Sequence, residues 1–257
     1  MLSKNQVKQI QSLHLKKNRV EQGLFIAEGP KLSEEIIGSR IKVREIFALK
    51  NWLEKNHEAI HGSIAVTSVA EEELKKISTL STPNQVVVIC EIPHAEIDYT
   101  LVEKELTVFL DDIRDPGNLG TIIRVADWFG LSQVICSEEC VEVYSPKTIM
   151  SSMGSISRVN VVTADFAEVK RNLQDKGKHV PVYGAVLSGE NIYSAKDLSP
   201  GLLVIGNESN GISEKVMRGL THRIKIPSSS KNGAESLNAA IAASLVIAEF
   251  FRRQEHC

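Results

Sequence analysis

Asn118 and Arg124 lie close together in the stretch "DPGNLGTIIRVADWFG", residues 115–130. This stretch begins with a Pro-Gly turn and continues as an amphipathic helix. Its glycines allow the backbone to approach a ligand, and a helix start presents unpaired N–H groups. The pair therefore indicates binding of a polar ligand. The alternatives are structural: Asn118 equally fits a helix cap, and Arg124 a solvated position on the helix surface.

Two later loops have a similar character. In "VIGNESNGIS", residues 204–213, Glu208 stands among amides and Gly211 opens the next helix. In "IPSSSKNGAESLNAAIAAS", residues 226–244, a long polar loop leads into an apolar helix, and such loops in compact domains are usually functional or disordered. "ESLN" also fits a helix cap. Neither loop carries a G-x-G-x-x-G or a lysine-ended Walker motif, which disfavours nicotinamide and nucleoside-triphosphate enzymes.

The hydrophobic pattern predicts which elements position these loops. Apolar strands are expected at 106–112, 131–137, 180–187, 201–206 and 223–227, and helices at 118–130, 165–177, 212–220 and 235–253. Alternating strands and helices predict an α/β fold with a parallel sheet. Ligands of such sheets bind at the carboxyl ends of the strands, where all three loops are expected.

The first ninety residues also alternate between helix and strand. Strands are expected at 23–29, 43–49, 63–68 and 85–92, and a helix with proline at its start is expected at 30–37. Ser68 and Glu71 have the spacing of a capping box at the head of the helix 69–77. Residues 93–105 are polar, acidic and without a clear period, so they are expected to be a linker. This divides the chain into domains 1–92 and 106–257.

Composition narrows the class of protein. The formal charge is −2, yet the first twenty residues hold five basic side chains and no acid. This local basic face, which includes Lys16, Lys17 and Arg19, fits phosphate binding, with a solvated helix face as the alternative. The four cysteines lack the further ligands of a metal site, so no metal is expected. No run reaches the roughly 18 apolar residues of a membrane span, which predicts a soluble, cytoplasmic protein.

Together, the three loops resemble the three signature motifs of the SpoU (TrmH) family of RNA ribose methyltransferases, within the SPOUT superfamily. The matching stretches are "DPGNLGTIIRVADWFG", "LLVIGNESNGIS" and "IKIPSSSKNGAESLNAAIAAS". The first ninety residues, with "GLFIAEGPKLSEEII", resemble the RNA-binding domain that often precedes this catalytic domain. That domain is similar to the ribosomal proteins that bind kink-turn RNA.

The resemblance implies a fold and an activity. The catalytic domain would be a parallel sheet whose C-terminal stretch is threaded into a trefoil knot, and the protein would be a homodimer with its site near the subunit interface. The reaction would be S-adenosylmethionine-dependent methylation of a ribose 2′-hydroxyl in ribosomal or transfer RNA. The alternative is an RNA-binding protein that retains the fold without catalysis. The retention of all five family site residues favours the enzyme.

The resemblance also assigns residues by position. The catalytic candidates are Asn118, Arg124, Glu208, Ser236 and Asn238. Gly206, Ile226 and Leu237 match positions that contact the cofactor, largely through their backbone. Lys231, in the polar third loop, joins Lys16, Lys17 and Arg19 as a candidate for RNA binding. Because a guanidinium is effectively always protonated, Arg124 is expected to bind the phosphate beside the target ribose and stabilise the developing alkoxide, rather than act as a base.

Overall fold

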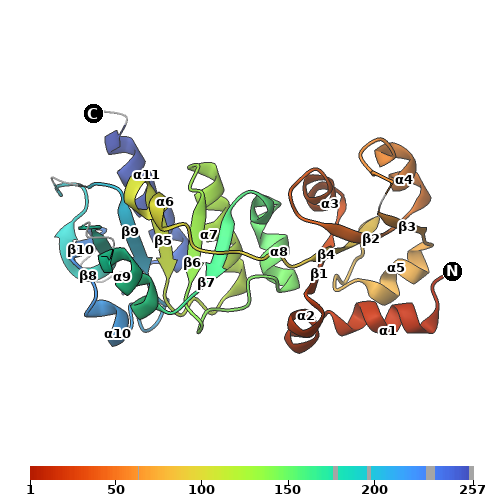
Figure 1. Ribbon diagram of the computed structural model, residues 1–257, viewed down its shortest axis with the longest axis horizontal. Helices are drawn as coiled ribbons and strands as arrows, with labels where there is room; N and C mark the ends of the chain where they lie inside the picture. The colour runs from red at the N-terminus through yellow and green to blue at the C-terminus, as the bar shows by residue number, and fades with distance from the viewer. Residues whose placement is uncertain (63, 176–178, 196–197, 230–234, 255–257) are drawn as a thin grey trace. The chain divides into compact units, whose positions relative to one another are not determined.

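The computed structural model describes residues 1–257 with the exception of 63, 176–178, 196–197, 230–234 and 255–257. The chain forms two compact units (Figure 1). The first combines Met1–His94 with Glu142–Arg158, and the second combines Ala95–Val141 with Val159–Cys257. The segment Glu142–Arg158 therefore belongs to the first unit, although the sequence pattern placed it in the domain 106–257.

The first unit is built around a four-stranded sheet in the order β1-β4-β2-β3. Strand β4 is antiparallel to β1 and β2, and β2 is parallel to β3. The strands are β1 Leu24–Glu28, β2 Val43–Ala48, β3 Ala65–Ser68 and β4 Val86–Glu91. The helices are α1 Lys4–Ser12, α2 Lys16–Gln22, α3 Pro30–Ile37, α4 Lys50–Asn56, α5 Glu71–Ile77, α8 Pro146–Ser152 and the short η1 Ser155–Ser157.

Most elements of this unit follow the sequence pattern. The apolar run at 85–92 is a central strand with Val86–Cys90 buried, and Pro30 occupies the first turn of α3. The predicted capping box of Ser68 and Glu71 is wrong, because Ser68 is the last residue of β3. The N-cap of α5 is instead Ala70, whose N–H donates to the carboxylate of Glu73 at 3.1 Å. The same S/T-x-x-E spacing therefore occurs two residues too early to cap the helix.

The second unit contains a parallel six-stranded sheet in the order β10-β8-β9-β5-β6-β7. Its strands are β5 Leu106–Leu110, β6 Gln133–Cys136, β7 Asn160–Thr163, β8 Val182–Asn191, β9 Gly201–Ile205 and β10 His222–Lys225. Its helices are α6 Tyr99–Lys104, α7 Pro116–Trp128, α9 Phe166–Asp175, α10 Glu214–Met217 and α11 Ala239–Gln254. The predicted parallel α/β fold is confirmed. Strand β7 and helix α6 were not predicted, since short elements show too few turns or alternations to reveal a period.

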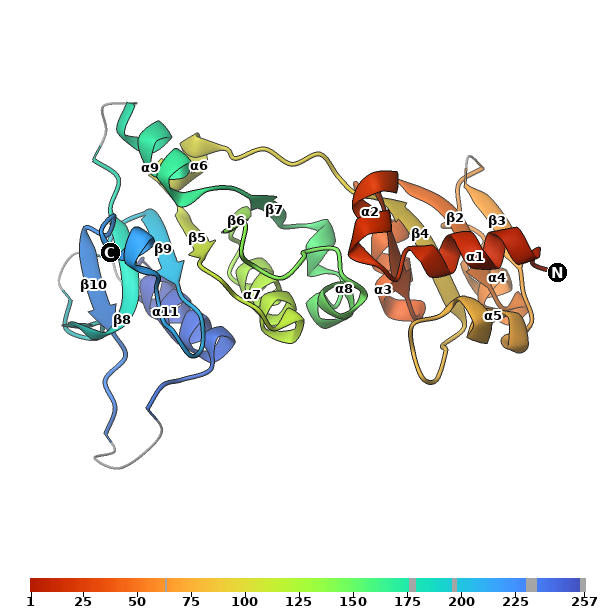
Figure 2. The same cartoon turned by 90° about the horizontal axis from the view of Figure 1, so that it is seen from below.

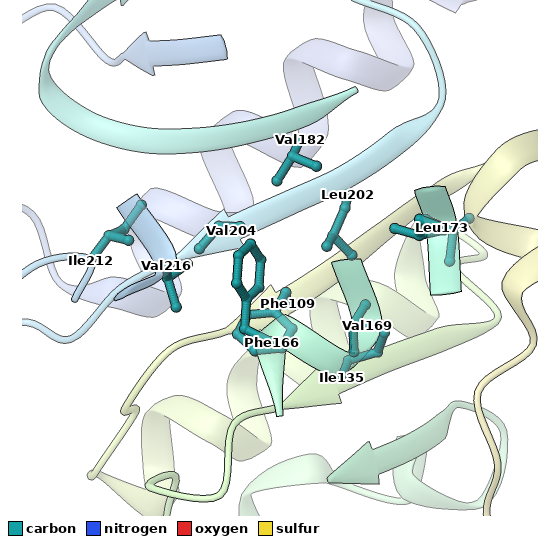
Figure 3. Close-up of a cluster of buried hydrophobic side chains, with 11 residues drawn as sticks. Phe109, Ile135, Phe166, Val169, Leu173, Val182, Leu202, Val204, Ile212 and Val216 are labelled. Atoms are coloured by element: carbon teal, nitrogen blue, oxygen red, sulfur yellow. The ribbon is translucent and has the colours of Figure 1, made fainter. Parts of the chain in front are cut away.

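Helices cover both faces of this sheet, with α6 and α9 on one side and α7 and α11 on the other (Figure 2). The core on the first side joins α6, α9 and α10 to the central strands (Figure 3), where the rings of Phe109 and Phe166 meet edge to face with centroids 5.1 Å apart. Val102 of α6 is fully buried in this cluster, which explains why half of the expected linker is helical. On the other side, Phe129 after α7 contacts Phe251 of α11 with centroids 5.2 Å apart.

A buried carboxylate anchors the end of α11. The Glu249 side chain is 5% exposed and accepts hydrogen bonds from Arg252 and Arg253. Arg253 in turn donates to the backbone carbonyls of Ile192 and Ala195, beyond the end of β8. These guanidinium hydrogen bonds outweigh the effect of burial and lower the pKa of Glu249 from 4.5 to about 2.

This anchor predicts a dependence of stability on pH. Because the pKa of Glu249 is lower in the folded protein, its stabilisation is present above pH 4.5 and is lost as the pH falls toward 2. We expect Glu249→Gln to lower the free energy of unfolding by about 2 kcal/mol at pH 7 and by much less at pH 2.5. Urea unfolding followed by circular dichroism at both pH values measures this. An equal loss at both pH values would contradict it.

Candidate active site

The first motif begins helix α7, and a residue other than the predicted one caps this helix. Asp115 is the N-cap, and its carboxylate accepts the backbone N–H of Asn118 at 2.8 Å. Pro116 occupies the first helical position, where its missing N–H has no partner to lose. The capping role considered for Asn118 is therefore taken by Asp115. The carboxamide of Asn118, half-buried at the mouth of the helix, is left for other contacts.

Asn118 joins the three loops. Its Nδ2 donates to the carboxylate of Glu208 in the second loop, and its Oδ1 accepts from Nδ2 of Asn238 in the third loop at 2.9 Å. Ser236 Oγ lies 3.4 Å from the backbone oxygen of Glu208, to which it donates. The structure thus brings together four of the five predicted catalytic residues, from positions up to 120 residues apart.

Asn238 has two roles at once. Its Oδ1 accepts the backbone N–H groups of Ala240 at 3.0 Å and Ile241 at 3.3 Å, at the start of α11. The prediction that "ESLN" caps a helix is therefore confirmed for Asn238, and capping is compatible with a role of this residue in the site. Capping fixes the side chain, so that its Nδ2 is directed at Asn118.

The second loop is held closely by its own backbone. Asn207 and Gly211 exchange two backbone hydrogen bonds of 3.0 and 2.9 Å, and a β carbon on Gly206 would lie 2.4 Å from the backbone of Gly211 and Ile212. Only glycine is compatible with this approach. Glu208 projects from the closed loop toward Asn118.

Arg124 does not join this network. It is exposed, and it makes no hydrogen bond or ion pair within the part of the chain that the structure describes. Successive helical residues are rotated by about 100°, so Arg124 faces about 120° away from Asn118 on α7. Arg124 does share its face with Trp128, one turn later, which is also exposed. Its predicted role therefore requires a ligand or a second chain at this outer face.

The predicted cofactor residues follow strand ends or precede α11. Gly206 follows β9 and Ile226 follows β10, so both lie at the carboxyl ends of the parallel strands. Leu237 lies between Ser236 and Asn238 with a side chain 45% exposed. These three positions offer backbone carbonyl groups and uncharged side chains. Such groups suit a positively charged sulfonium, which lysine side chains would repel.

The predicted RNA-binding residues separate into three groups. Lys16 and Lys17 of α2 are exposed. Arg19 is only 3% exposed, and its guanidinium donates to Glu142 Oε1 at 2.8 Å and to the backbone oxygen of Leu13 at 2.7 Å. The prediction that Arg19 belongs to an exposed basic face is therefore wrong, because a carboxylate 123 positions away neutralises it inside the first unit. Lys231 lies outside the described residues.

The structure adds residues that sequence reasoning passed over. Asp111 is buried and accepts the backbone N–H of Ser213 at 2.6 Å, and Asn207 donates to the backbone oxygen of Asp112 at 2.8 Å. Asp112 adopts a left-handed φ of 57°. The signal available in the sequence was the pair of aspartates directly after an apolar strand. Over the ranges described, no cluster of His, Cys, Asp and Glu side chains could hold a metal ion, and no helix is long and apolar enough to span a membrane.

Comparison with protein families assigns both parts of the chain. Residues 105–248 match the model of the SpoU rRNA Methylase family. Residues 4–88 match the model of the MRM3-like substrate binding domain.

Individual relatives agree with these matches. The chain is 30% identical over 247 residues to the 23S rRNA (guanosine(2553)-2′-O)-methyltransferase of Bacillus subtilis, covering 95% of this chain and 96% of that protein. A crystal structure of an S-adenosylmethionine-bound rRNA methyltransferase from Sinorhizobium meliloti superimposes with a TM-score of 0.85 at 28% identity, over 98% and 96% of the two chains. A Porphyromonas gingivalis protein assigned to the TrmH family gives 0.89 at 35% identity, over 98% and 99%.

Proposed function

Because the chain belongs to the SpoU rRNA methylase family and is thus an RNA methyltransferase, we propose that it transfers a methyl group from S-adenosylmethionine to a ribose 2′-hydroxyl. The substrate is ribosomal or transfer RNA. The observation that carries this proposal is the contact of Asn118 with Glu208 and Asn238, which joins all three motif loops at the carboxyl ends of the strands. An RNA-binding protein without catalysis is the less favoured reading, since such a protein has no need of this network.

The reaction requires that the ribose 2′-hydroxyl be aligned with the methyl group and that the hydroxyl lose its proton. S-adenosylmethionine supplies a methyl group already activated by its sulfonium. The residues of this chain would align the ribose 2′-hydroxyl with that methyl group, and the hydroxyl proton would pass to solvent water. The Asn118 carboxamide, with one N–H on Glu208, keeps a second N–H that can bind a ribose oxygen. Glu208 fixes which end of the amide points into the site, so the hydroxyl meets a prearranged donor.

In this proposal Arg124 stabilises negative charge on the RNA. Its guanidinium binds the phosphate beside the target ribose and stabilises the alkoxide that develops as the proton leaves. Its exposure on α7 and its lack of partners among the described residues leave all of its donors for a polyanion.

Gly206, Ile226 and Leu237 hold the cofactor in this proposal, chiefly through backbone groups. Calorimetry with S-adenosylmethionine tests this. Wild type should bind, Leu237→Trp should lose binding because the indole would occupy the space proposed for the cofactor, and Leu187→Trp, at an exposed site on β8, should bind as wild type does. A radiolabelled methyl transfer assay on ribosomal and transfer RNA, followed by mapping of 2′-O-methyl groups, then identifies the substrate. Absence of cofactor binding by wild type, with and without total RNA, would favour the inactive RNA binder.

In this proposal the first unit binds the RNA. Its fold is proposed to be related to that of ribosomal proteins that bind kink-turn RNA. We expect Lys16→Ala combined with Lys17→Ala to weaken RNA binding and to reduce the slope of log affinity against log salt by about 1 to 2, because up to two phosphate contacts are lost. Filter binding across a salt series measures the slope. The matched control is Lys50→Ala with Lys55→Ala on α4, also exposed, which should leave it unchanged. Equal slopes for all proteins would reject the basic face.

A homodimer is also part of the proposal. Trp128 is 84% exposed, and Ile241 and Leu245, one turn apart on the adjacent α11, are 51% and 40% exposed. Exposed apolar residues concentrated on neighbouring helices are typical of an interface. We expect wild type to sediment as a dimer of 28.3 kDa chains and Ile241→Glu to sediment as a monomer. Leu187→Glu, which places the same charge on β8, should remain dimeric. A monomeric wild type would contradict this.

The finer topology of the second unit is proposed as a trefoil knot. Support comes from the segment before α11, where Ser236 contacts the loop after β9 and Asn238 contacts the loop after β5. The segment before α11 therefore passes close to both earlier motifs, as threading of the chain into a knot requires.

A further inference from the structure

Asn207 is a buried amide whose hydrogen-bonding groups are satisfied by two different loops. Its Oδ1 accepts the backbone N–H groups of Ser209 at 2.9 Å and Asn210 at 3.0 Å, within the loop after β9. Its Nδ2 donates at 2.8 Å to the backbone oxygen of Asp112, in the loop after β5. The residue is 9% exposed, so these bonds are partly shielded from water.

The partner of Asn207 is itself held in an unusual conformation. Asp112 has a left-handed φ of 57°, which is uncommon for a residue with a side chain. Its backbone N–H donates to Ser137 Oγ at 3.1 Å, and its carbonyl accepts from Asn207. Left-handed residues that are fixed on both sides occur preferentially at functional sites.

Three contacts join the segment 111–118 to the segment 207–213. Asp111 accepts from Ser213, Asp112 accepts from Asn207, and Asn118 donates to Glu208. The first two each link a buried side chain, Asp111 or Asn207, to a backbone group of the other loop, whereas the third joins two half-buried side chains that are proposed to face the substrate. The two contacts of buried side chains therefore help to fix the separation of the loops across which the third contact forms.

We propose that Asn207 is a positioning residue for methyl transfer, acting through Glu208 and Asn118. This inference rests on the proposed function. Glu208 follows Asn207 directly, so the turn that Asn207 closes sets the direction of the Glu208 side chain. The bond from Asn207 to Asp112 sets the distance to the loop that carries Asn118. The Asn207 amide supplies both the acceptor for the turn and the donor for the neighbouring loop.

Asn207→Asp separates the two halves of this role. The carboxylate keeps the acceptor for Ser209 and Asn210, but it has no donor for the carbonyl of Asp112. We expect kcat to fall about 10- to 100-fold, as for a small misplacement of reacting groups. The KM for RNA should stay within about twofold of wild type, because the proposed RNA-binding lysines are untouched. Asn210→Asp introduces the same charge in the same loop through an exposed carboxamide, and it should change kcat less than about twofold.

A second readout distinguishes positioning from a loss of stability. The side-chain amide signals of Asn118 in a ¹H–¹⁵N spectrum, assigned by their absence in Asn118→Asp, should shift in Asn207→Asp and keep their wild-type positions in Asn210→Asp. Thermal unfolding confirms that the variants are folded at the assay temperature. Unchanged Asn118 signals together with an unchanged kcat would overturn the inference, as would a lower melting temperature with unchanged kcat.

Failure of the proposed function has a different signature. In that case wild type binds no S-adenosylmethionine and methylates no RNA. The spectra of Asn118 then still test whether Asn207 positions the loops, since they require neither cofactor nor substrate. Shifted signals in Asn207→Asp would support the positioning of Asn118, and unshifted signals would reject it.

Discussion

Asn118→Ala is expected to lower kcat by about 100- to 1,000-fold while the protein remains folded and still binds S-adenosylmethionine. The reason is that one carboxamide contacts both other motif loops, through Glu208 and Asn238, and in the proposed mechanism offers its remaining N–H to the ribose. Loss of a prearranged donor at a reacting oxygen has an effect of this size. Single-turnover methylation of the substrate RNA measures the rate, and calorimetry measures cofactor affinity.

Two further variants make this result specific. Asn118→Asp places a second carboxylate against Glu208, and the repulsion should reduce the rate at least as far as alanine does. Thr121→Ala, one turn along α7, removes an exposed hydroxyl that donates only to the backbone oxygen of Gly117, and it should change the rate less than about threefold. If Asn118→Ala retained more than a tenth of wild-type activity, the network would be structural rather than catalytic.

Arg124→Ala is expected to lower kcat/KM by about 100- to 1,000-fold, because it removes the positive group that, in the proposed mechanism, binds the phosphate and the developing alkoxide. Arg124→Lys should recover part of the activity, since a lysine keeps the charge but not the planar, bidentate geometry. Arg218→Ala, which removes an exposed arginine paired with Glu214 on the same unit, should have little effect. Steady-state methylation kinetics over a range of RNA concentrations measure each value.

The pH profile of Arg124→Lys decides whether Arg124 stabilises negative charge or acts as a general base. A group that stabilises charge works only while protonated, so the lysine variant should lose activity as the pH approaches the ordinary lysine value of about 10.4. A general base works only when deprotonated, and lysine loses its proton more readily than arginine. A lysine variant at least as active as wild type at raised pH would therefore count against charge stabilisation.

Periodicity was a reliable guide to the main elements. The apolar strands around Phe109 and Val204 and the amphipathic α7 lie close to where the pattern placed them, because strands buried on both faces are continuous apolar runs and a helix with one buried face has a 3.6-residue repeat. The pattern missed α6, α8 and β7, because helices of six and seven residues and a strand of four show little repeat. The cap of α7 was ambiguous for a related reason: Asp115 and Asn118 are both good capping residues, and only the backbone geometry selects Asp115.

The sequence did not indicate which charged side chains of the first unit are exposed. Lys16, Lys17 and Arg19 look equivalent in the sequence, but Arg19 is buried against Glu142. Nothing within a few residues of Arg19 indicates this partner, which the fold brings from the segment Glu142–Arg158. The same holds for Asn207, whose donor finds the carbonyl of Asp112 only when β9 and β5 lie side by side.

The sequence by itself determined the class of the protein: a parallel α/β sheet, three polar loops at strand ends, and the residue types that the family requires there. Such features depend on local repeats and on the identity of single residues. Only the tertiary structure decided which polar groups meet. Asn118, Glu208 and Asn238 become neighbours because parallel strands place their carboxyl ends at one edge, and the amide of Asn207 bonds both its own loop and the backbone of Asp112 because largely buried polar groups need partners.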